Sequence, residues 1–322
     1  MLASEAVSTV RTAVLALGGN ALARSDEPAT VANQFRHARE SVAPIVELAR
    51  QGWRIVIVHG NGPQVGDELL RNEAARKVAE PLPLGVLVAE TAGWIGYMIQ
   101  QSLQNALATA RVQREVVTVI TQTLVDRYDP ALSRPTKPIG HALSDKEAAR
   151  IREAGRAVDR DGAGAWRRMA TSPIPLGVVE FPVIKRLLDQ GTVVIAAGGG
   201  GPPVYLDPLL GLEGLDAVVD KDRVSAILAS QLEAEVLMIL TNVEAVFEGW
   251  GTPQARPIRR MTVEQAEQMI ARGSLDAGGM KPKIEAAAGF VSRGGTRAII
   301  ARLSDGPAAL RGETGTTIMR RP

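Results

Sequence analysis

Three glycine-containing turns each follow a short, mainly apolar run, and this pattern constrains the fold more than any other feature. The runs are residues 13–17, 54–58 and 192–197, and the turns are Gly18-Gly19-Asn20, Gly60-Asn61-Gly62 and Gly198-Gly199-Gly200-Gly201. An apolar run that ends at glycine is typical of a buried parallel strand that delivers a turn to the edge of a sheet. Ligands of open α/β sheets bind at that edge. We therefore predict that these turns contribute to a binding site.

Segments with helical spacing alternate with further strand-like runs along the rest of the chain. We predict helices at residues 31–50, 65–79, 86–108, 182–190, 223–230, 261–271 and 282–292, and further strands at 115–125, 236–240, 297–301 and, as an edge strand, 316–319. This alternation favours an α/β fold in which helices cover both faces of a mostly parallel sheet. Residues 122–175 break the alternation and contain several prolines and glycines, so we predict a small part that projects from the main body.

The composition is that of an ordinary globular protein, with 45% hydrophobic and 22% charged residues among 322. The net charge is only +2 and no basic stripe stands out, which argues against nucleic acid as a partner. Because the chain has no cysteine, a disulfide framework and a thiol nucleophile are excluded. No apolar run approaches the roughly 20 residues that span a bilayer, and residues 1–11 lack the layout of a signal peptide. We therefore expect a cytoplasmic protein without a membrane partner.

Two lysines stand where a solvated surface role explains them poorly. Lys221 has an aspartate on each side, Asp220 and Asp222, at a junction between an apolar run and a helix. The aspartates could be no more than helix caps. Lys283 opens an apolar helix, where a cation opposes the helix dipole unless it has an anionic partner. Lys137 lies in a stiff proline-flanked segment and could either reach over a cleft or stay at the surface. Glycine turns and lysines held by carboxylates are what phosphoryl transfer requires.

The familiar signatures of other nucleotide and catalytic sites are missing. The glycines at 60, 62 and 66 miss the dinucleotide fingerprint by one position, and the chain has no P-loop. The histidines, His37, His59 and His141, are not spaced as metal ligands or as part of a triad. We therefore predict no metal site built from protein ligands, and we expect His37 to lie on the surface. The lack of an evident general base fits phosphoryl transfer to an oxygen that is already anionic.

Six motifs, in order over nearly the whole chain, resemble those of the amino acid kinase family, most closely its carbamate kinase branch. They are Ala16-Leu17-Gly18-Gly19-Asn20-Ala21, His59-Gly60-Asn61-Gly62-Pro63-Gln64-Val65-Gly66, Thr136-Lys137-Pro138-Ile139-Gly140, Gly198 to Pro202, Val219-Asp220-Lys221-Asp222 and Met280-Lys281-Pro282-Lys283-Ile284-Glu285-Ala286-Ala287. The resemblance implies a single amino acid kinase domain over residues 1–322, folded as an open three-layer αβα sandwich. Residues 11–214 would form the substrate lobe, including the projecting part at 122–175, and residues 215–322 the nucleotide lobe.

The resemblance also implies reversible phosphoryl transfer between ATP and carbamate, which yields ADP and carbamoyl phosphate, with Mg²⁺ bridging the nucleotide phosphates. It implies a homodimer that makes ATP in arginine breakdown. Lys221 and Lys283 would neutralise the transferred group, Asp222 would orient these lysines, and Lys137 would close over the substrate. The phosphates and the substrate would be bound by Gly18, Gly19, Asn20, Gly60, Asn61, Gly62, Gly199 and Gly200, and the nucleotide by Thr241, Asn242, Val243 and Met280.

Three segments depart from the family's common pattern. They are Ala163-Gly164-Ala165, Thr171-Ser172-Pro173 and His141-Ala142-Leu143, and all lie within residues 122–175. These departures motivate a first alternative, a related kinase that acts on another small carboxylate or a phosphonate. A second alternative is a non-catalytic metabolite sensor with the same fold. The retained lysines argue against the sensor, because a pure binder has no need of cations that act on transition-state charge.

Overall fold

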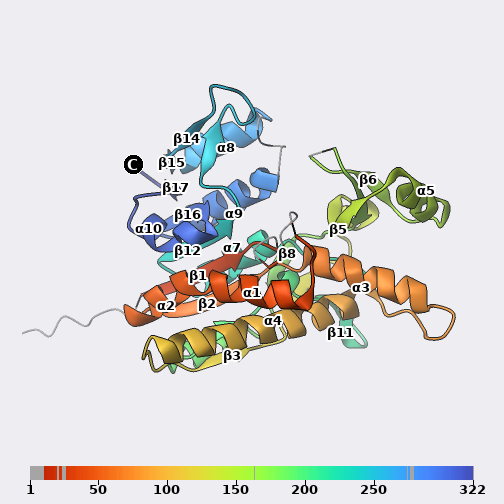
Figure 1. Ribbon diagram of the computed structural model, residues 1–322, viewed down its shortest axis with the longest axis horizontal. Coiled ribbons are helices and arrows are strands. Elements are labelled where there is room, and N and C mark those ends of the chain that lie inside the picture. Colours follow the sequence, from red (N-terminus) through yellow and green to blue (C-terminus); the bar gives the residue numbers. More distant parts are fainter. Residues whose placement is uncertain are drawn as a thin grey trace, which may run out of the picture.

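The computed structural model describes residues 11–19, 22–23, 27–162, 164–273, 275 and 279–321 (Figure 1). Asn20 and Ala163, named above, lie outside these ranges. The strands are β1 Thr12–Leu17, β2 Arg54–His59, β3 Val116–Thr118, β4 Thr123–Val125, β5 Lys137–Leu143, β6 Val158–Arg160, β7 Trp166–Ala170, β8 Pro175–Val178, β9 Val193–Ile195, β10 Pro203–Asp207, β11 Gly211–Gly214, β12 Val236–Thr241, β13 Val246–Glu248, β14 Arg256–Ile258, β15 Arg260–Thr262, β16 Arg297–Arg302 and β17 Thr316–Met319. The α-helices are α1 Val31–Ser41, α2 Ala43–Arg50, α3 Gly62–Ala75, α4 Leu84–Thr109, α5 Asp145–Glu153, α6 Phe181–Asp189, α7 Lys221–Gln231, α8 Val263–Ala271, α9 Met280–Ser292 and α10 Gly306–Leu310.

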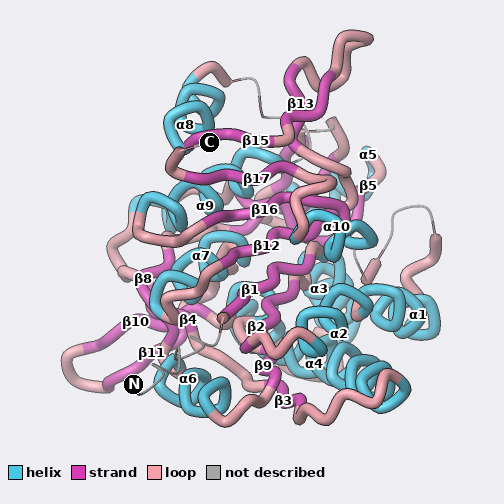
Figure 2. The backbone as a smooth tube through the Cα atoms, turned by 90° about the vertical axis from the view of Figure 1, so that its left-hand side faces the viewer, coloured by secondary structure: helices cyan, strands magenta, loops and turns pink. Residues whose placement is uncertain are grey.

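An eight-stranded sheet forms the centre of the molecule, in the order β15-β17-β16-β12-β1-β2-β9-β3. Its neighbouring strands are parallel except for the β16–β17 pair. Figure 2 shows this order from top to bottom, with α7 and α9 on one side of the sheet and α1, α2 and α4 on the other. The predicted α/β class with a mostly parallel sheet between two helical layers is confirmed.

The central strands are apolar on both faces because helices cover both. In β1, Ala13, Leu15 and Leu17 pack into a cluster with α2 and α4, whereas Val14 and Ala16 pack into a second cluster with α7 and α9. Side chains of a strand point alternately to its two faces, so a strand buried on both sides reads as a continuous apolar run. This is why residues 13–17 could be recognised from the sequence. No helix within the described ranges is long and apolar enough to cross a bilayer.

Several predicted elements differ from the structure where local chemistry interrupts an apolar pattern. The single helix predicted at 31–50 is two helices, because Pro44 lies in the first turn of α2 and has no N–H for a continuous ladder. The helix predicted from residue 261 begins at Val263. Thr262 caps it through a capping box with Gln265, and residues 260–262 form β15 instead.

The strand predicted at 115–125 is wrong as a single element. β3 pairs with β9 in the central sheet, whereas β4 pairs with β8 and β10 in a second sheet. β9 ends at Ile195, just before Ala197 adopts a left-handed conformation, so β3 has no partner beyond that point. The strand at 316–319 is not an edge strand, since β15 lies outside it. We did not predict the hairpins β10–β11 and β13–β14.

A small three-stranded sheet, β5-β7-β6, carries α5 and stands to one side of the main body (Figure 1). We call residues 137–170 the projecting sheet; they fall within the predicted range 122–175. The two ends of the predicted range do not belong to the projecting sheet. They contain β4 and the first residue of β8, and these two strands pair with each other beside the central sheet. The projecting sheet packs against α3, where His141 Nε2 lies 3.0 Å from Asp67 Oδ1 and Arg168 forms an ion pair with Glu73.

Backbone also meets backbone where the projecting sheet packs on α3. A Cβ added to Gly66 would lie 2.0 Å from the Cα and 2.6 Å from the N of Gly140. We expect Gly66→Ala to displace the projecting sheet, since neither chain can yield as a flexible side chain would, and to cost about 1–3 kcal/mol of stability. Hydrogen exchange across residues 137–143 should accelerate.

Gly93→Ala is the matched control for that substitution. A Cβ at Gly93 would make an ordinary contact of 3.6 Å with Ile120, and Ala favours a helix interior. This variant should keep the stability and exchange pattern of the parent. Unchanged exchange in Gly66→Ala would show that the contact with α3 does not hold the projecting sheet.

Candidate active site

The first two glycine turns meet at the carboxyl edge of the central sheet. Gly18 N donates a hydrogen bond to Leu240 O at 2.9 Å, and Gly60 N donates to Leu17 O at 2.9 Å. A Cβ on Gly60 would lie 2.7 Å from Gly19 N and 3.3 Å from Lys221 Cδ. Only glycine allows the two turns and the stem of this lysine to approach so closely.

The third turn lies behind the second rather than beside it. Gly199 has φ +66° and packs against the side chain of Asn61, while Gly200 has φ +89° and packs against Val219 O. Both glycines are buried. The amide Nδ2 of Asn61 donates to Thr91 Oγ1 of α4 at 2.8 Å. Gly199 and Gly200 therefore shape the loops that carry Asn61 and the 219–222 segment.

Three helices begin at this edge. α3 starts directly after Asn61, α7 after Asp220 and α9 after Gly279. Free backbone N–H groups and the positive end of the dipole make a helix N-terminus favourable for an anion. Because Asp220 already caps α7, the starts of α3 and α9 are the ones suited to an anionic ligand.

A cluster of three lysines and two aspartates, which we call the lysine–aspartate cluster, lies among these helix starts. Lys221 Nζ is 2.5 Å from Asp222 Oδ1, and Lys283 Nζ is 3.3 Å from Asp222 Oδ2. Lys137, from the projecting sheet, forms an ion pair with Asp220. The two aspartates are buried. Lys283 has in Asp222 the anionic partner that its place at a helix start requires.

The cluster keeps its carboxylates ionised. Burial alone would raise the pKa of Asp222, but Lys221 and Lys283 outweigh it and the pKa lies below its usual value. Burial, aided by the charge of Lys283, lowers the pKa of Lys221 despite its contact with Asp222. Three cations against two anions leave one excess positive charge, which an incoming phosphate would neutralise.

His59 and His37 are both buried, so the prediction that His37 lies on the surface is wrong. His37 is 1% exposed; its Nδ1 lies 2.8 Å from Leu22 O and its Nε2 3.1 Å from Glu27 Oε1. Both ring nitrogens thus have a polar partner inside the protein, which the position of His37 in a helical pattern did not reveal. His59 ends β2 and adjoins the second glycine turn, and burial lowers its pKa to about 4.

Acid should destabilise the protein through His59. Because its pKa is about 4 in the folded chain against an ordinary value of 6.5, the unfolded chain binds the proton more readily. Stability is therefore lost as the pH falls from 6.5 towards 4, by up to about 3 kcal/mol. Denaturant unfolding between pH 7.5 and 4.5 measures this slope. His59→Gln should flatten it, and an identical slope in the variant would contradict the assignment.

The four residues expected to bind nucleotide lie at the same edge. Thr241 ends β12, and its Cα would be 3.9 Å from a Cβ on Gly18. Asn242 is exposed, and Val243 is half-buried. Met280 is the first residue of α9 and packs against the apolar core on that face of the sheet. The lysine–aspartate cluster is thus adjoined by the turns that follow β1 and β12 and by the start of α9.

Comparison with known proteins agrees with this architecture. The model of the amino acid kinase family matches residues 11–302. A curated carbamate kinase of Pyrococcus horikoshii is 42% identical over 308 residues, which cover 95% of this chain and 98% of the relative. The chain belongs to the amino acid kinase family. The resemblance read from the motifs is therefore confirmed.

Other members of the amino acid kinase family extend the comparison. A carbamate kinase-like protein of Escherichia coli, YahI, is 40% identical over 95% of this chain and 98% of its own. The structure of Giardia lamblia carbamate kinase bound to citric acid superposes with a TM-score of 0.91 at 36% identity, over 97% of this chain and 99% of that one. The same enzyme bound to AMP-PNP gives a TM-score of 0.87, also at 36% identity and the same coverage.

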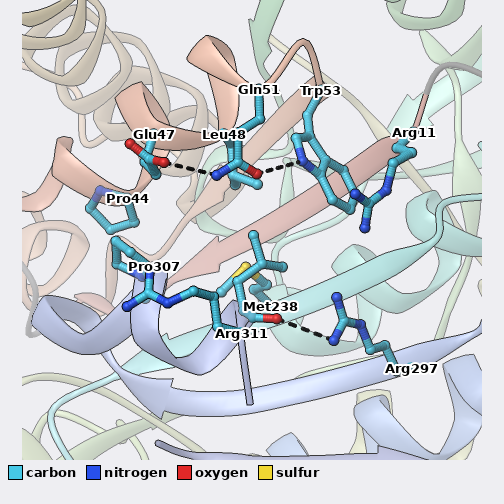
Figure 3. A pocket seen from close by; sticks show the side chains of 12 residues that line it. Arg11, Pro44, Glu47, Leu48, Gln51, Trp53, Met238, Arg297, Pro307 and Arg311 are labelled. Atoms are coloured by element: carbon cyan, nitrogen blue, oxygen red, sulfur yellow. Dashed lines mark hydrogen bonds between the residues drawn. The ribbon is translucent and has the colours of Figure 1, made fainter. Parts of the chain in front are cut away.

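A cavity of about 170 Å³ lies at the opposite, amino edge of the sheet (Figure 3). Its arginines already have partners. Arg11 donates to both carboxylate oxygens of Glu235 and stacks 3.9 Å from the centre of the Trp53 ring, and Arg297 donates to Leu310 O. Because open α/β sheets bind ligands at the carboxyl edge, this cavity is not the candidate active site.

Asp220 is the site residue whose full role the sequence did not reveal. We considered it as a helix cap, and it is one: its Oδ1 accepts from the backbone N–H of Asp222 and Arg223. Its ion pair with Lys137 joins positions 83 residues apart, which no local pattern predicts. The only hint in the sequence that Asp220 belongs to the site was that Lys221 has an aspartate on each side. In the described part of the chain, no three acidic or histidine side chains converge as metal ligands.

Proposed function

We propose that this protein is a carbamate kinase that transfers a phosphoryl group reversibly between ATP and carbamate. The observation that carries the proposal is the lysine–aspartate cluster. Lys137, Lys221 and Lys283 come from distant parts of the sequence and gather around Asp220 and Asp222, next to the glycine turns. Preorganised cations at a place where negative charge develops stabilise the transition state of phosphoryl transfer.

In the ATP-forming direction, an oxygen of the ADP β-phosphate attacks the phosphorus of carbamoyl phosphate. The bond between phosphorus and the carbamate oxygen breaks, and carbamate leaves as an anion. The attacking oxygen carries no proton at neutral pH, so no general base is required. Lys221 and Lys283 neutralise the transferred group, Asp222 holds both lysines in place, and Lys137 faces the carbamate end.

The phosphates and the carbamate would be bound by backbone N–H groups of the glycine turns. We assign this role to Gly19, Asn20, Asn61 and Gly62. The N–H groups of Gly18 and Gly60 already donate to Leu240 O and Leu17 O, so Gly18 and Gly60, like Gly199 and Gly200, support the site by allowing the turns to approach each other. Gly19 adjoins Gly60, and α3 begins beside them without a hydrogen bond to the side chain of its capping residue, Asn61. Residues 11–214 would then form the substrate lobe and residues 215–322 the nucleotide lobe.

The nucleotide would lie over Thr241, Asn242, Val243 and Met280. Mg²⁺ fits this site as an ion carried by the nucleotide, because both oxygens of Asp222 already face lysines and those of Asp220 face Lys137 and the backbone. Bound to the phosphate oxygens, the ion would supply further charge neutralisation.

We further propose a cytoplasmic homodimer that makes ATP in arginine breakdown. β3 is the edge strand of the central sheet, so within the described part of the chain one of its sides has no neighbouring strand in that sheet. Two exposed side chains are near it in the sequence or the fold: Tyr97 lies on α4, and Ile120 follows β3. An open strand edge beside exposed apolar side chains favours pairing with a second copy.

The deciding experiment is ATP formation from ADP, Mg²⁺ and carbamoyl phosphate by purified protein, coupled to hexokinase. We expect turnover at or above roughly 1 s⁻¹, the low end for ordinary enzymes. If the protein binds ADP but forms no ATP, the acceptor is different or the protein is a sensor. A screen of small carboxylates and phosphonates, motivated by the three divergent segments and by relatives named only as carbamate kinase-like, then separates these two alternatives.

A further inference from the structure

Asp220 joins two parts of the molecule that are far apart in the sequence. It is 5% exposed and immediately precedes α7, whose first turn carries Lys221 and Asp222. Its Oδ1 accepts from Asp222 N at 2.9 Å and from Arg223 N at 3.2 Å, while its Oδ2 accepts from Lys137 Nζ. One oxygen therefore orders the helix start, and the other holds a lysine of the projecting sheet.

This contact differs from the others that dock the projecting sheet. Gly140, His141 and Arg168 all meet α3, at Gly66, Asp67 and Glu73 respectively. Lys137 instead reaches the start of α7, in the predicted nucleotide lobe. It is the first residue of β5, so its position depends on where the projecting sheet lies.

We propose that Asp220 is a positioning residue that holds Lys137 over the transfer site and so couples docking of the projecting sheet to catalysis. This inference rests on the proposed function. An ammonium group has three N–H donors, and Asp220 takes one, which leaves two for an anionic substrate. The side chain of Lys137 is 36% exposed, so without the pull of Asp220 its charge would turn to solvent.

The electrostatics agree with this geometry. Burial alone would lower the pKa of Lys137, but the charge of Asp220 outweighs it and raises the pKa above the ordinary value. Burial would raise the pKa of Asp220, and Lys137 lowers it instead. The two groups thus keep each other charged, and a cation is preserved where the carbamate end of the substrate would arrive.

Asp220→Asn separates the two tasks of the residue. Asparagine caps helices as well as aspartate does, so the start of α7 should be kept, but the anion that holds Lys137 is removed. We expect kcat/KM for carbamoyl phosphate to fall roughly tenfold to a hundredfold, as a misplaced catalytic group does. The loss of stability should be smaller than in Asp222→Asn, because the Lys137 side chain that is left without its partner is 36% exposed. Lys137→Met should show a similar fall in kcat/KM.

The double variant Asp220→Asn with Lys137→Met provides the sharper test. If Asp220 acts through Lys137, the double variant should be no slower than Lys137→Met alone, because the second change has nothing left to misplace. The proposal would be overturned if the losses of kcat/KM in the two single variants multiplied in the double variant. It would also be overturned if kcat/KM of Asp220→Asn were within twofold of the parent value. Asp189→Asn, which removes the exposed ion pairs of Asp189 with Lys185 of α6 and with Arg54, is the control and should leave turnover unchanged.

Hydrogen exchange distinguishes failure of this inference from failure of the proposed function. If the parent protein forms no ATP, the proposed function fails, but the contact can still be tested. Exchange across residues 137–143 should then be faster in Asp220→Asn than in Asp189→Asn. Equal exchange in the two variants would show that Asp220 does not hold the projecting sheet.

Discussion

Lys283→Ala should lower kcat for ATP formation by at least about a hundredfold, the cost of removing a group that contacts developing charge in the transition state. The ammonium of Lys283 lies 3.3 Å from Asp222 and 3.4 Å from Gly279 O, beside the N-terminus of α9. Asp222 offsets the unfavourable interaction of this charge with the helix dipole and so keeps the ammonium in place for an anionic ligand. The measurement is steady-state turnover with saturating ADP and carbamoyl phosphate.

Lys281→Ala is the matched control for that substitution. Lys281 lies on the first turn of the same helix and has the same charge and length. We expect its loss to change kcat by less than about threefold, because Lys281 is not part of the lysine–aspartate cluster. Near-normal turnover in Lys283→Ala, or an equal loss in both variants, would contradict the role assigned to Lys283.

Asp222→Asn should destabilise the protein by about 3–5 kcal/mol, the usual cost of removing one partner from a buried ion pair. Asparagine preserves the size of the side chain, so the loss is one of charge. Lys221 and Lys283 then face each other without a carboxylate, and the side chain of Lys221 is only 12% exposed. Urea unfolding at pH 7.5 measures the difference, and turnover should fall together with stability.

A pH titration adds a signature that cavity formation alone would not produce. Burial already lowers the pKa of Lys221, and removal of Asp222 takes away the main charge that opposes this shift. A lysine with a folded pKa below its unfolded value destabilises the fold while charged, so the variant should regain stability as the pH rises towards 10. Asp189→Asn should lose no more than about 0.5 kcal/mol. A flat pH profile for Asp222→Asn would exclude this account.

Much of the fold could be predicted because the central strands are buried on both faces. Residues 13–17 and 236–240 are continuous apolar runs, and they became β1 and β12 in one parallel sheet. Predictions failed where a strand's partner, rather than its own residues, decides where it ends. Residues 115–125 read as one strand, yet β9 ends at Ile195 and the chain crosses to a second sheet.

The sequence by itself determined the chemical groups of the candidate site: the glycine turns, the lysines and the aspartates around Lys221. Their residue types and local spacing carry that information, because phosphate binding needs free N–H groups and phosphoryl transfer needs cations. Only the tertiary structure decided which groups meet. Lys137 and Asp220 are 83 positions apart, and they touch because the projecting sheet docks on α3 where Gly66 and Gly140 permit backbone contact. Such a pairing depends on packing between separate elements, which no local pattern encodes.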